Sequence, residues 1–309
     1  MRRRLGSGHL VVSAAVLSAF VLSACGPTPG NGPGDIEARN SSTTTAGAPV
    51  DTAPVTTSAP PVTEPSKPVS WSWDEASASY VPTGTPPECP SPLIDEGALL
   101  DLGAVQSKLL PGQVRDGEYL VNGTFRWSGP DQPYPTDVVI TMPFDGYVTG
   151  AWQFLKSGVY LFGLNIVHPC GLMVRLSKMH DPSPEVKSAL LDALGEAREK
   201  DSRETFYNPG IWLPKGTVLA TSVGVPPPND QPDVVGAQLD VAILDLRARN
   251  PQIPDDFDFT QWSGSAAPQY VFFQVCFYQG DYLSANEQAI IESLPLGGGS
   301  PDSDTCVSS

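Results

Sequence analysis

Histidine, a frequent metal ligand and the most frequent general base in enzymes, is scarce in this sequence. Only three of the 309 residues are histidines, and none occurs between Gly26 and Val167. A hydrolytic zinc ion needs about three protein ligands and an open position for water. His168 and His180 do not supply such a site by themselves. The sequence therefore predicts no bound metal and no cofactor.

Two motifs of nucleophilic and metal chemistry are also missing. The chain has no Cys-x-x-Cys pair, which argues against a zinc ribbon or a redox-active dithiol. It has no Gly-x-Ser-x-Gly sequence, the strand-to-helix turn that presents a nucleophilic serine. We therefore assign no catalytic residue from motifs, and the sequence points away from an enzyme.

Basic residues are few compared with acidic ones. The 18 Lys and Arg residues face 34 Asp and Glu. Without Arg2, Arg3 and Arg4, which belong to the N-terminal segment described next, 15 basic residues remain and the net charge is −19. So acidic a surface repels polyanions. This excludes nucleic acid as an expected partner.

No apolar run reaches the ~20 residues of a membrane-spanning helix. The longest run, from Leu10 to Leu22, follows the three arginines and ends in Leu22-Ser23-Ala24-Cys25. This order resembles a bacterial lipoprotein signal, which predicts a signal peptide over 1–24 and acylation of Cys25. The protein would then be lipid-anchored to the cell membrane on its extracytoplasmic side. The alternative is an ordinary signal peptide in which Cys25 has no role.

Residues 25–70 contain no aromatic side chain and are rich in Pro, Thr and Ser. Such a segment buries too little apolar surface to offset the entropy of ordering it. We expect a disordered tether between the anchor and a folded region that starts near Trp71.

Four cysteines remain after Cys25, and an exported domain with an even number of cysteines favours disulfides. Cys276 and Cys306 flank one short C-terminal segment, so we favour that pair, which leaves Cys89 with Cys170. One bridge with two free thiols is the alternative. Cys170 beside His168 or His180 is also a weaker candidate for a nucleophile.

The folded region is expected to be mostly β, with short apolar or alternating runs bounded by Gly and Pro turns. A helix is predicted after Ser183, where Pro184 suits the first turn, and another after Ser284, which forms a capping box with Glu287. We divide the region into an N-terminal part over 71–135, a β domain over 136–250 with a helical insertion at 183–200, and a disulfide-closed extension over 251–309. The expected strands are 119–127, 138–142, 146–155, 159–168, 172–179, 218–223, 237–246 and 270–277.

Four segments of the β domain resemble, in order, the motifs of LytM-type (M23) peptidoglycan endopeptidases. They are MPFDGYV (142–148), GLNIVHPCGLMVRLSKMH (163–180), KGTVLATSVG (215–224) and AQLDVAI (237–243). The resemblance covers about half of the folded region and implies an M23-like antiparallel sheet. The helical insertion departs from the compact members of the family.

The chemistry of that family does not carry over. Its enzymes bind zinc through a His-x-x-x-Asp motif and a His-x-His motif. The first histidine is absent here, and Gln238 and Asp240 stand at the positions of the second motif. His180 alone matches a catalytic position. The resemblance therefore implies a relic site of His180, Gln238 and Asp240 with no metal.

The sequence as a whole predicts a non-catalytic binding or scaffolding module in the cell envelope. Its candidate ligands are peptidoglycan, another polysaccharide or an envelope protein. The alternative is a cell-wall hydrolase with an atypical active site near His180.

Overall fold

The computed structural model describes residues 69–115, 118–120, 122–127, 135–156, 158–198, 202–224, 237–253, 268–297, 303 and 305–306. These all belong to one compact unit, Ala59–Ser309. The expected signal peptide, Cys25 and nearly all of the expected tether lie outside the described residues.

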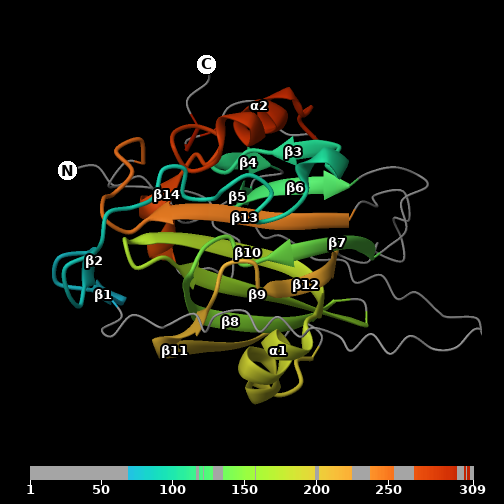
Figure 1. Cartoon of the computed structure of the whole chain (residues 1–309), viewed down its shortest axis with the longest axis horizontal. Coiled ribbons are helices and arrows are strands. Elements are labelled where there is room, and N and C mark those ends of the chain that lie inside the picture. The colour runs from blue at the N-terminus through green and yellow to red at the C-terminus, as the bar shows by residue number, and fades with distance from the viewer. Residues whose placement is uncertain are drawn as a thin grey trace, which may run out of the picture. The chain divides into compact units, whose positions relative to one another are not determined.

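The prediction of a mostly β, antiparallel fold with two helical segments is confirmed. Within the described residues, ten strands form one sheet whose main path runs β11-β8-β9-β10-β13-β6-β3, and every pairing in it is antiparallel (Figure 1). β12 pairs with β10 and β7, and β14 pairs with β13. The bounds are β3 (Ser107–Leu109), β6 (Gly123–Trp127), β7 (Thr136–Thr141), β8 (Gly146–Lys156), β9 (Val159–Val167), β10 (Leu172–Pro182), β11 (Arg203–Leu213), β12 (Val218–Val223), β13 (Ala237–Asp245) and β14 (Gln274–Val275).

Two further pairs of strands lie outside the main sheet. β1 (Trp71–Asp74) and β2 (Ser79–Pro82) form an antiparallel hairpin, and β4 (Gln113–Arg115) pairs with β5 (Glu118–Leu120). The expected single strand over 119–127 is therefore wrong. Its first residues belong to β5, and its last five form β6 in the main sheet.

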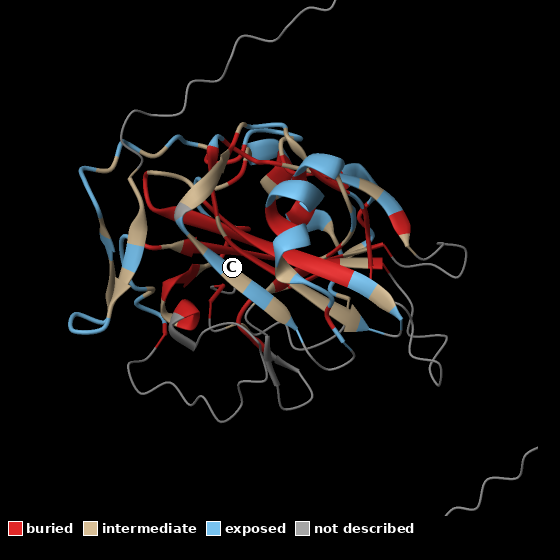
Figure 2. Cartoon of the chain, turned by 90° about the horizontal axis from the view of Figure 1, so that it is seen from below, coloured by how far each residue is buried: buried red, intermediate tan, exposed pale blue. Residues whose placement is uncertain are grey.

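The middle of the main sheet is buried on both faces. On β9, the seven residues from Leu161 to Val167 are all buried, which explains why this stretch is apolar without alternation. One face carries the larger core, with Leu164, Val174 and Val241 among its members. The other face carries a smaller core that the β1–β2 hairpin helps to cover. Figure 2 shows the buried residues running through the centre and the exposed residues on the outer sides of the helices.

Both predicted helices form, but they differ in regularity. The segment after Ser183 consists of α1 (Pro184–Val186), a π-helical turn (Lys187–Leu191) and a 3-10 turn (Asp192–Leu194). Ser183 caps it by accepting from the Val186 N–H. The C-terminal helix α2 (Ala285–Ser293) has the expected capping box, in which Ser284 Oγ accepts from the Glu287 N–H and contacts its carboxylate.

One strand prediction is largely wrong, and one observed strand was not expected. The run 270–277 is apolar, but its first half belongs to a 3-10 helix (Pro268–Phe273), and only Gln274–Val275 pairs as β14. Apolar runs this short do not distinguish strand from helix by periodicity. β11 (Arg203–Leu213) was not among the expected strands, and its Asn208-Pro209-Gly210 sequence is typical of a turn. This strand is at the edge of the sheet, and its register with β8 shifts between Phe206 and Ile211, where proline is tolerated.

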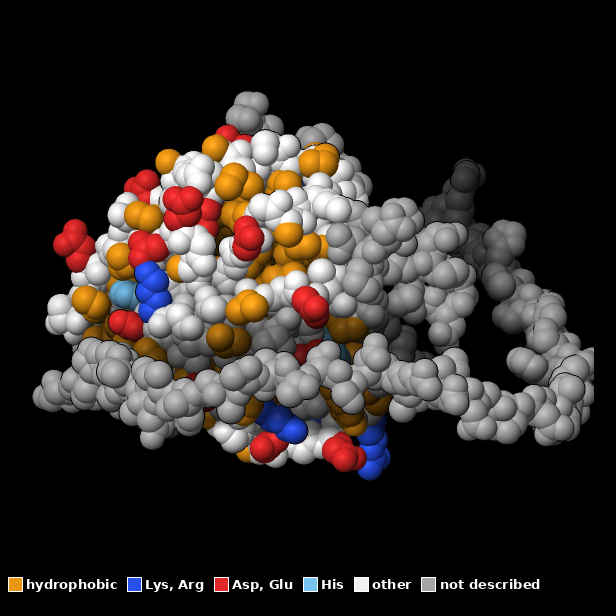
Figure 3. All heavy atoms as spheres, turned by 45° about the vertical axis from the view of Figure 1, so that its right-hand side comes forward, with side chains coloured by type: hydrophobic (Ala, Val, Ile, Leu, Met, Phe, Trp, Pro, Cys, Tyr) orange, Lys and Arg blue, Asp and Glu red, His pale blue; other side chains and the backbone are white. Residues whose placement is uncertain are grey.

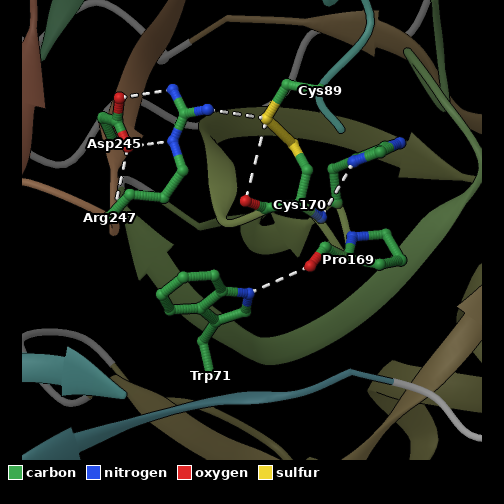
Figure 4. The surroundings of a disulfide bond; sticks show 7 residues. Trp71, Cys89, Pro169, Cys170, Asp245 and Arg247 are labelled. Atoms are coloured by element: carbon green, nitrogen blue, oxygen red, sulfur yellow. Dashed lines mark hydrogen bonds and ion pairs between the residues drawn. A yellow bond between two sulfur atoms is a disulfide. The ribbon is translucent and has the colours of Figure 1, made fainter. Parts of the chain in front are cut away.

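Both favoured cysteine pairs are disulfides, which confirms the predicted pairing: Cys89–Cys170 and Cys276–Cys306. The first bridge joins the segment after β2 to the turn between β9 and β10 (Figure 4). The side chain of Arg247 contacts it, with Nη1 3.0 Å from the Sγ of Cys89. Arg247 is held in turn by two hydrogen bonds to the Asp245 carboxylate.

Candidate functional site

His180 lies near the end of β10, where the strand is irregular. The register between β10 and β9 shifts between Leu176 and Met179, and both Lys178 and Asp181 have positive φ angles, 69° and 47°. Non-glycine residues seldom adopt this left-handed conformation, and such strain is frequent around functional sites. The irregularity turns Met179 into the larger core and leaves the His180 ring 22% exposed.

A small polar cluster surrounds the imidazole. The Nδ1 atom of His180 is 2.9 Å from Asp181 Oδ2 and 3.1 Å from Ser222 Oγ, and Ser222 Oγ donates to the same carboxylate oxygen at 2.8 Å. In a Ser-His-Asp triad the serine and the carboxylate contact opposite ring nitrogens. Here Ser222 and Asp181 both contact Nδ1. His180 therefore cannot activate Ser222 through one ring nitrogen while Asp181 orients the ring through the other.

Gln238 and Asp240, the other two residues of the expected relic site, lie on β13. Their even-numbered positions share a face with Ala242 and Leu244 of the smaller core. Met179 points into the larger core, so the next residue, His180, points to the opposite face. His180, Gln238 and Asp240 therefore lie on the same face of the sheet. No hydrogen bond within the described residues joins His180 to either of the other two, however. Asp240 instead binds Lys178 Nζ and Thr124 Oγ1, each at 2.9 Å.

His168 and Cys170 do not form a catalytic pair. Cys170 is in a disulfide, and its backbone N–H donates to the Nδ1 atom of His168 at 3.1 Å. The His168 ring also packs edge-on against Phe144. Burial lowers the pKa of His168, partly offset by the charge of Asp145. The residue therefore stabilises the β9–β10 turn as a neutral imidazole.

A buried cation that sequence patterns did not single out lies on the same face of the sheet. Arg175 of β10 is 4% exposed, and its guanidinium lies 4.0 Å from the ring centroid of Trp152 and 5.6 Å from that of Tyr270. Nη1 donates to Asn165 Oδ1 at 2.9 Å. Burial lowers the pKa of Arg175, and nearby tyrosines and carboxylates oppose this shift. Aromatic faces and an amide thus take the place of a direct ion pair among the described residues.

The described residues line a groove of about 920 Å³. It lies between the helical segment after Ser183 and strands β8, β9, β10 and β12. Sequence patterns did not reveal it, because its walls come from segments that only the fold brings together. Its lining combines buried apolar side chains with polar ones, an arrangement typical of ligand sites. The lining residues are Gln153, Tyr160, Leu161, Phe162, Asp181, Pro182, Ser183, Pro184, Lys187, Leu191, Asp192, Gly195, Glu196, Val218 and Thr221.

Among the described residues, no group of three or more His, Cys, Asp and Glu side chains is arranged to hold a metal ion. None of the helices in this part of the chain is long and apolar enough to span a bilayer. On the face in Figure 3, acidic side chains are scattered and Lys and Arg form no broad patch. Comparison of the chain with protein-family models, with curated proteins and with solved structures gave no match.

Proposed function

We propose that this protein is an exported lipoprotein, anchored to the cell membrane through Cys25, whose β domain is a non-catalytic binding module in the cell envelope. The observation that carries the proposal is the groove of about 920 Å³ beside the helical segment. Its volume is in the range of sites that bury a small ligand or a short piece of a polymer. The ligand is peptidoglycan, another envelope polysaccharide or an envelope protein.

The proposed M23-like character of the sheet has support from its strand order. The four motif segments fall on the turn between β7 and β8, on β9–β10, on β12 and on β13. β10 pairs directly with β9, β12 and β13, so segments far apart in the chain are neighbours in one sheet. A family relationship predicts such adjacency.

Co-sedimentation tests the binding function. The full-length chain, purified in a mild detergent, is mixed with purified insoluble peptidoglycan and centrifuged at low and at moderate salt. Retention in the pellet that saturates with protein concentration supports the proposal. Absence of retention at both salt concentrations would refute peptidoglycan as the ligand, and the same assay with the remaining envelope fraction then tests the other ligand classes.

One observation favours the alternative of a cell-wall hydrolase. The Asp181 carboxylate contacts the Nδ1 atom of His180, and such a contact orients an imidazole for proton transfer at Nε2. The discriminating measurement is the release of soluble muropeptides from cell walls, with metal content determined on the same sample. Release that disappears in His180→Gln would replace the binding function by the hydrolytic one.

A further inference from the structure

The groove beside the helical segment has an apolar base. Leu161 and Phe162 of β9 are buried there, as is Leu191 of the π-helical turn. The aromatic ring of Tyr160 stands at its edge, 42% exposed. A ligand in this groove therefore has an apolar base beneath it and the ring of Tyr160 at one edge.

The charged side chains that line the groove are mostly acidic. Asp181, Asp192 and Glu196 contribute carboxylates, and Lys187 is the one cation among the lining residues. The carboxylates of Asp192 and Glu196 make no hydrogen bond or ion pair with any other residue in the described part of the chain. Two carboxylates without partners beside an apolar base complement a ligand that carries positive charge.

We propose that the groove binds a peptide segment that carries ammonium groups as well as apolar side chains. This inference rests on the proposed binding function and specifies its ligand. The ammonium groups pair with Asp192 and Glu196, and the apolar side chains pack on the base between Leu161 and Leu191. A peptide fits better than a glycan, because sugar rings pack on exposed aromatic faces and Tyr160 is the only half-exposed aromatic ring in the lining.

The test uses fluorescence anisotropy with the full-length chain in mild detergent and a short fluorescein-labelled peptide of alternating Lys and Leu. The Asp192→Asn/Glu196→Gln variant keeps side-chain shape and removes two charges. We expect its affinity for the peptide to fall about tenfold at low salt, with a smaller loss at high salt. Lys187→Gln removes a like charge and is expected to raise the affinity about twofold.

The matched control is Glu75→Gln/Glu88→Gln, which removes the same charge from two exposed residues outside the groove. Its affinity is expected to stay close to that of the unmodified protein. A loss equal to that of the groove variant would mean that net charge alone attracts the peptide, and the site assignment would be wrong. Binding of the lysine-acetylated peptide with undiminished affinity would equally overturn the proposal, as would a preference for chitosan oligomers over the peptide.

The two proposals fail separately. If the groove variant sediments with the envelope fraction as well as the unmodified protein does, the binding function stands and the groove is not its site. If the unmodified protein binds no envelope material while the peptide binds the groove, the envelope function fails and the peptide specificity stands.

Discussion

The indole Nε1 atom of Trp71 donates a hydrogen bond to the carbonyl oxygen of Pro169 over 3.1 Å, although 98 residues separate them in the chain (Figure 4). The disulfide Cys89–Cys170 closes next to this contact. The start of the folded region is thus fastened to the β9–β10 turn twice, once by a hydrogen bond and once covalently.

The two disulfides should differ in their contributions to stability. In the chain-entropy model, a bridge stabilises more when it closes a longer loop. The sequence separations are 81 for Cys89–Cys170 and 30 for Cys276–Cys306. We expect Cys89→Ala/Cys170→Ala to lower the free energy of unfolding by about 1 kcal/mol more than Cys276→Ala/Cys306→Ala. Urea denaturation of the two double variants measures this, and a larger loss in the second would contradict it.

Arg175 should be replaceable by an apolar side chain of similar length. Arg175→Ala leaves a cavity between Trp152 and Tyr270, so we expect a loss of roughly 3–5 kcal/mol in the free energy of unfolding. Arg175→Met keeps the packing but removes the hydrogen bond that Arg175 donates to Asn165 Oδ1. We expect this to lower the free energy of unfolding by about 1–2 kcal/mol. Equal losses in the two variants, measured by urea denaturation, would show that the charge itself is required.

Gly163 provides the space for the Trp152 ring. A Cβ atom at this position would lie 2.1 Å from Trp152 Cζ2 and 2.6 Å from the carbonyl oxygen of Leu176. Gly163→Ala therefore displaces Trp152 from Arg175, and we expect a loss of about 1–3 kcal/mol. The control is Gly84→Ala, where the nearest atom is 3.8 Å away. Thermal denaturation compares the two, and similar melting temperatures would contradict the prediction.

His168 should make stability depend on pH. Burial lowers its pKa below the ordinary value of 6.5, so the native state resists protonation that the unfolded state accepts. As the pH falls below about 6.5, the unfolded state binds the additional proton and the free energy of unfolding decreases. The decrease ends below the folded-state pKa.

His168→Asn keeps an acceptor for the Cys170 N–H and removes this titration. The difference in unfolding free energy between about pH 7 and pH 5 should shrink in the variant; an unchanged difference would argue against the assignment.

Cys25 is expected to determine membrane attachment. Cys25→Ala removes the thiol that the signal-peptide motif would have acylated, so the protein should leave the membrane fraction. Fractionation and immunoblotting of cells that express each form measure this. A variant that stays in the membrane fraction and is processed like the original would rule out the lipid anchor.

The parts of the fold that sequence predicts are those set by local patterns. Ser284 and Glu287 lie three residues apart, so the capping box of α2 follows from the sequence alone. The central strands follow from apolar runs such as 161–167, and the disulfide pairing followed from the closeness of Cys276 and Cys306 in the chain. β11 was missed because Pro209 is acceptable only at a sheet edge, which no local pattern reveals.

The site residues depend on contacts between distant segments, and this limited their prediction. Ser222 lies 42 residues from His180, and nothing in either segment indicates that they share a carboxylate. Nothing in the sequence around Arg175 indicates that its place on β10 directs it between Trp152 and Tyr270. The groove likewise exists only because the helical segment folds back over β9 and β12.

The position of the β1–β2 hairpin has a mechanical consequence. A pulling force applied at Val69 enters the hairpin at Trp71 and leaves it at Pro82, and these two residues pair with each other. The residue pairs of the hairpin would therefore separate one after another, beginning with Trp71 and Pro82, and such sequential separation needs little force. Extension then stops at Cys89, where the disulfide carries the load to Cys170. The hairpin is an extensible element, and the main sheet comes under tension, through Cys170 in the β9–β10 turn, only after the hairpin has opened.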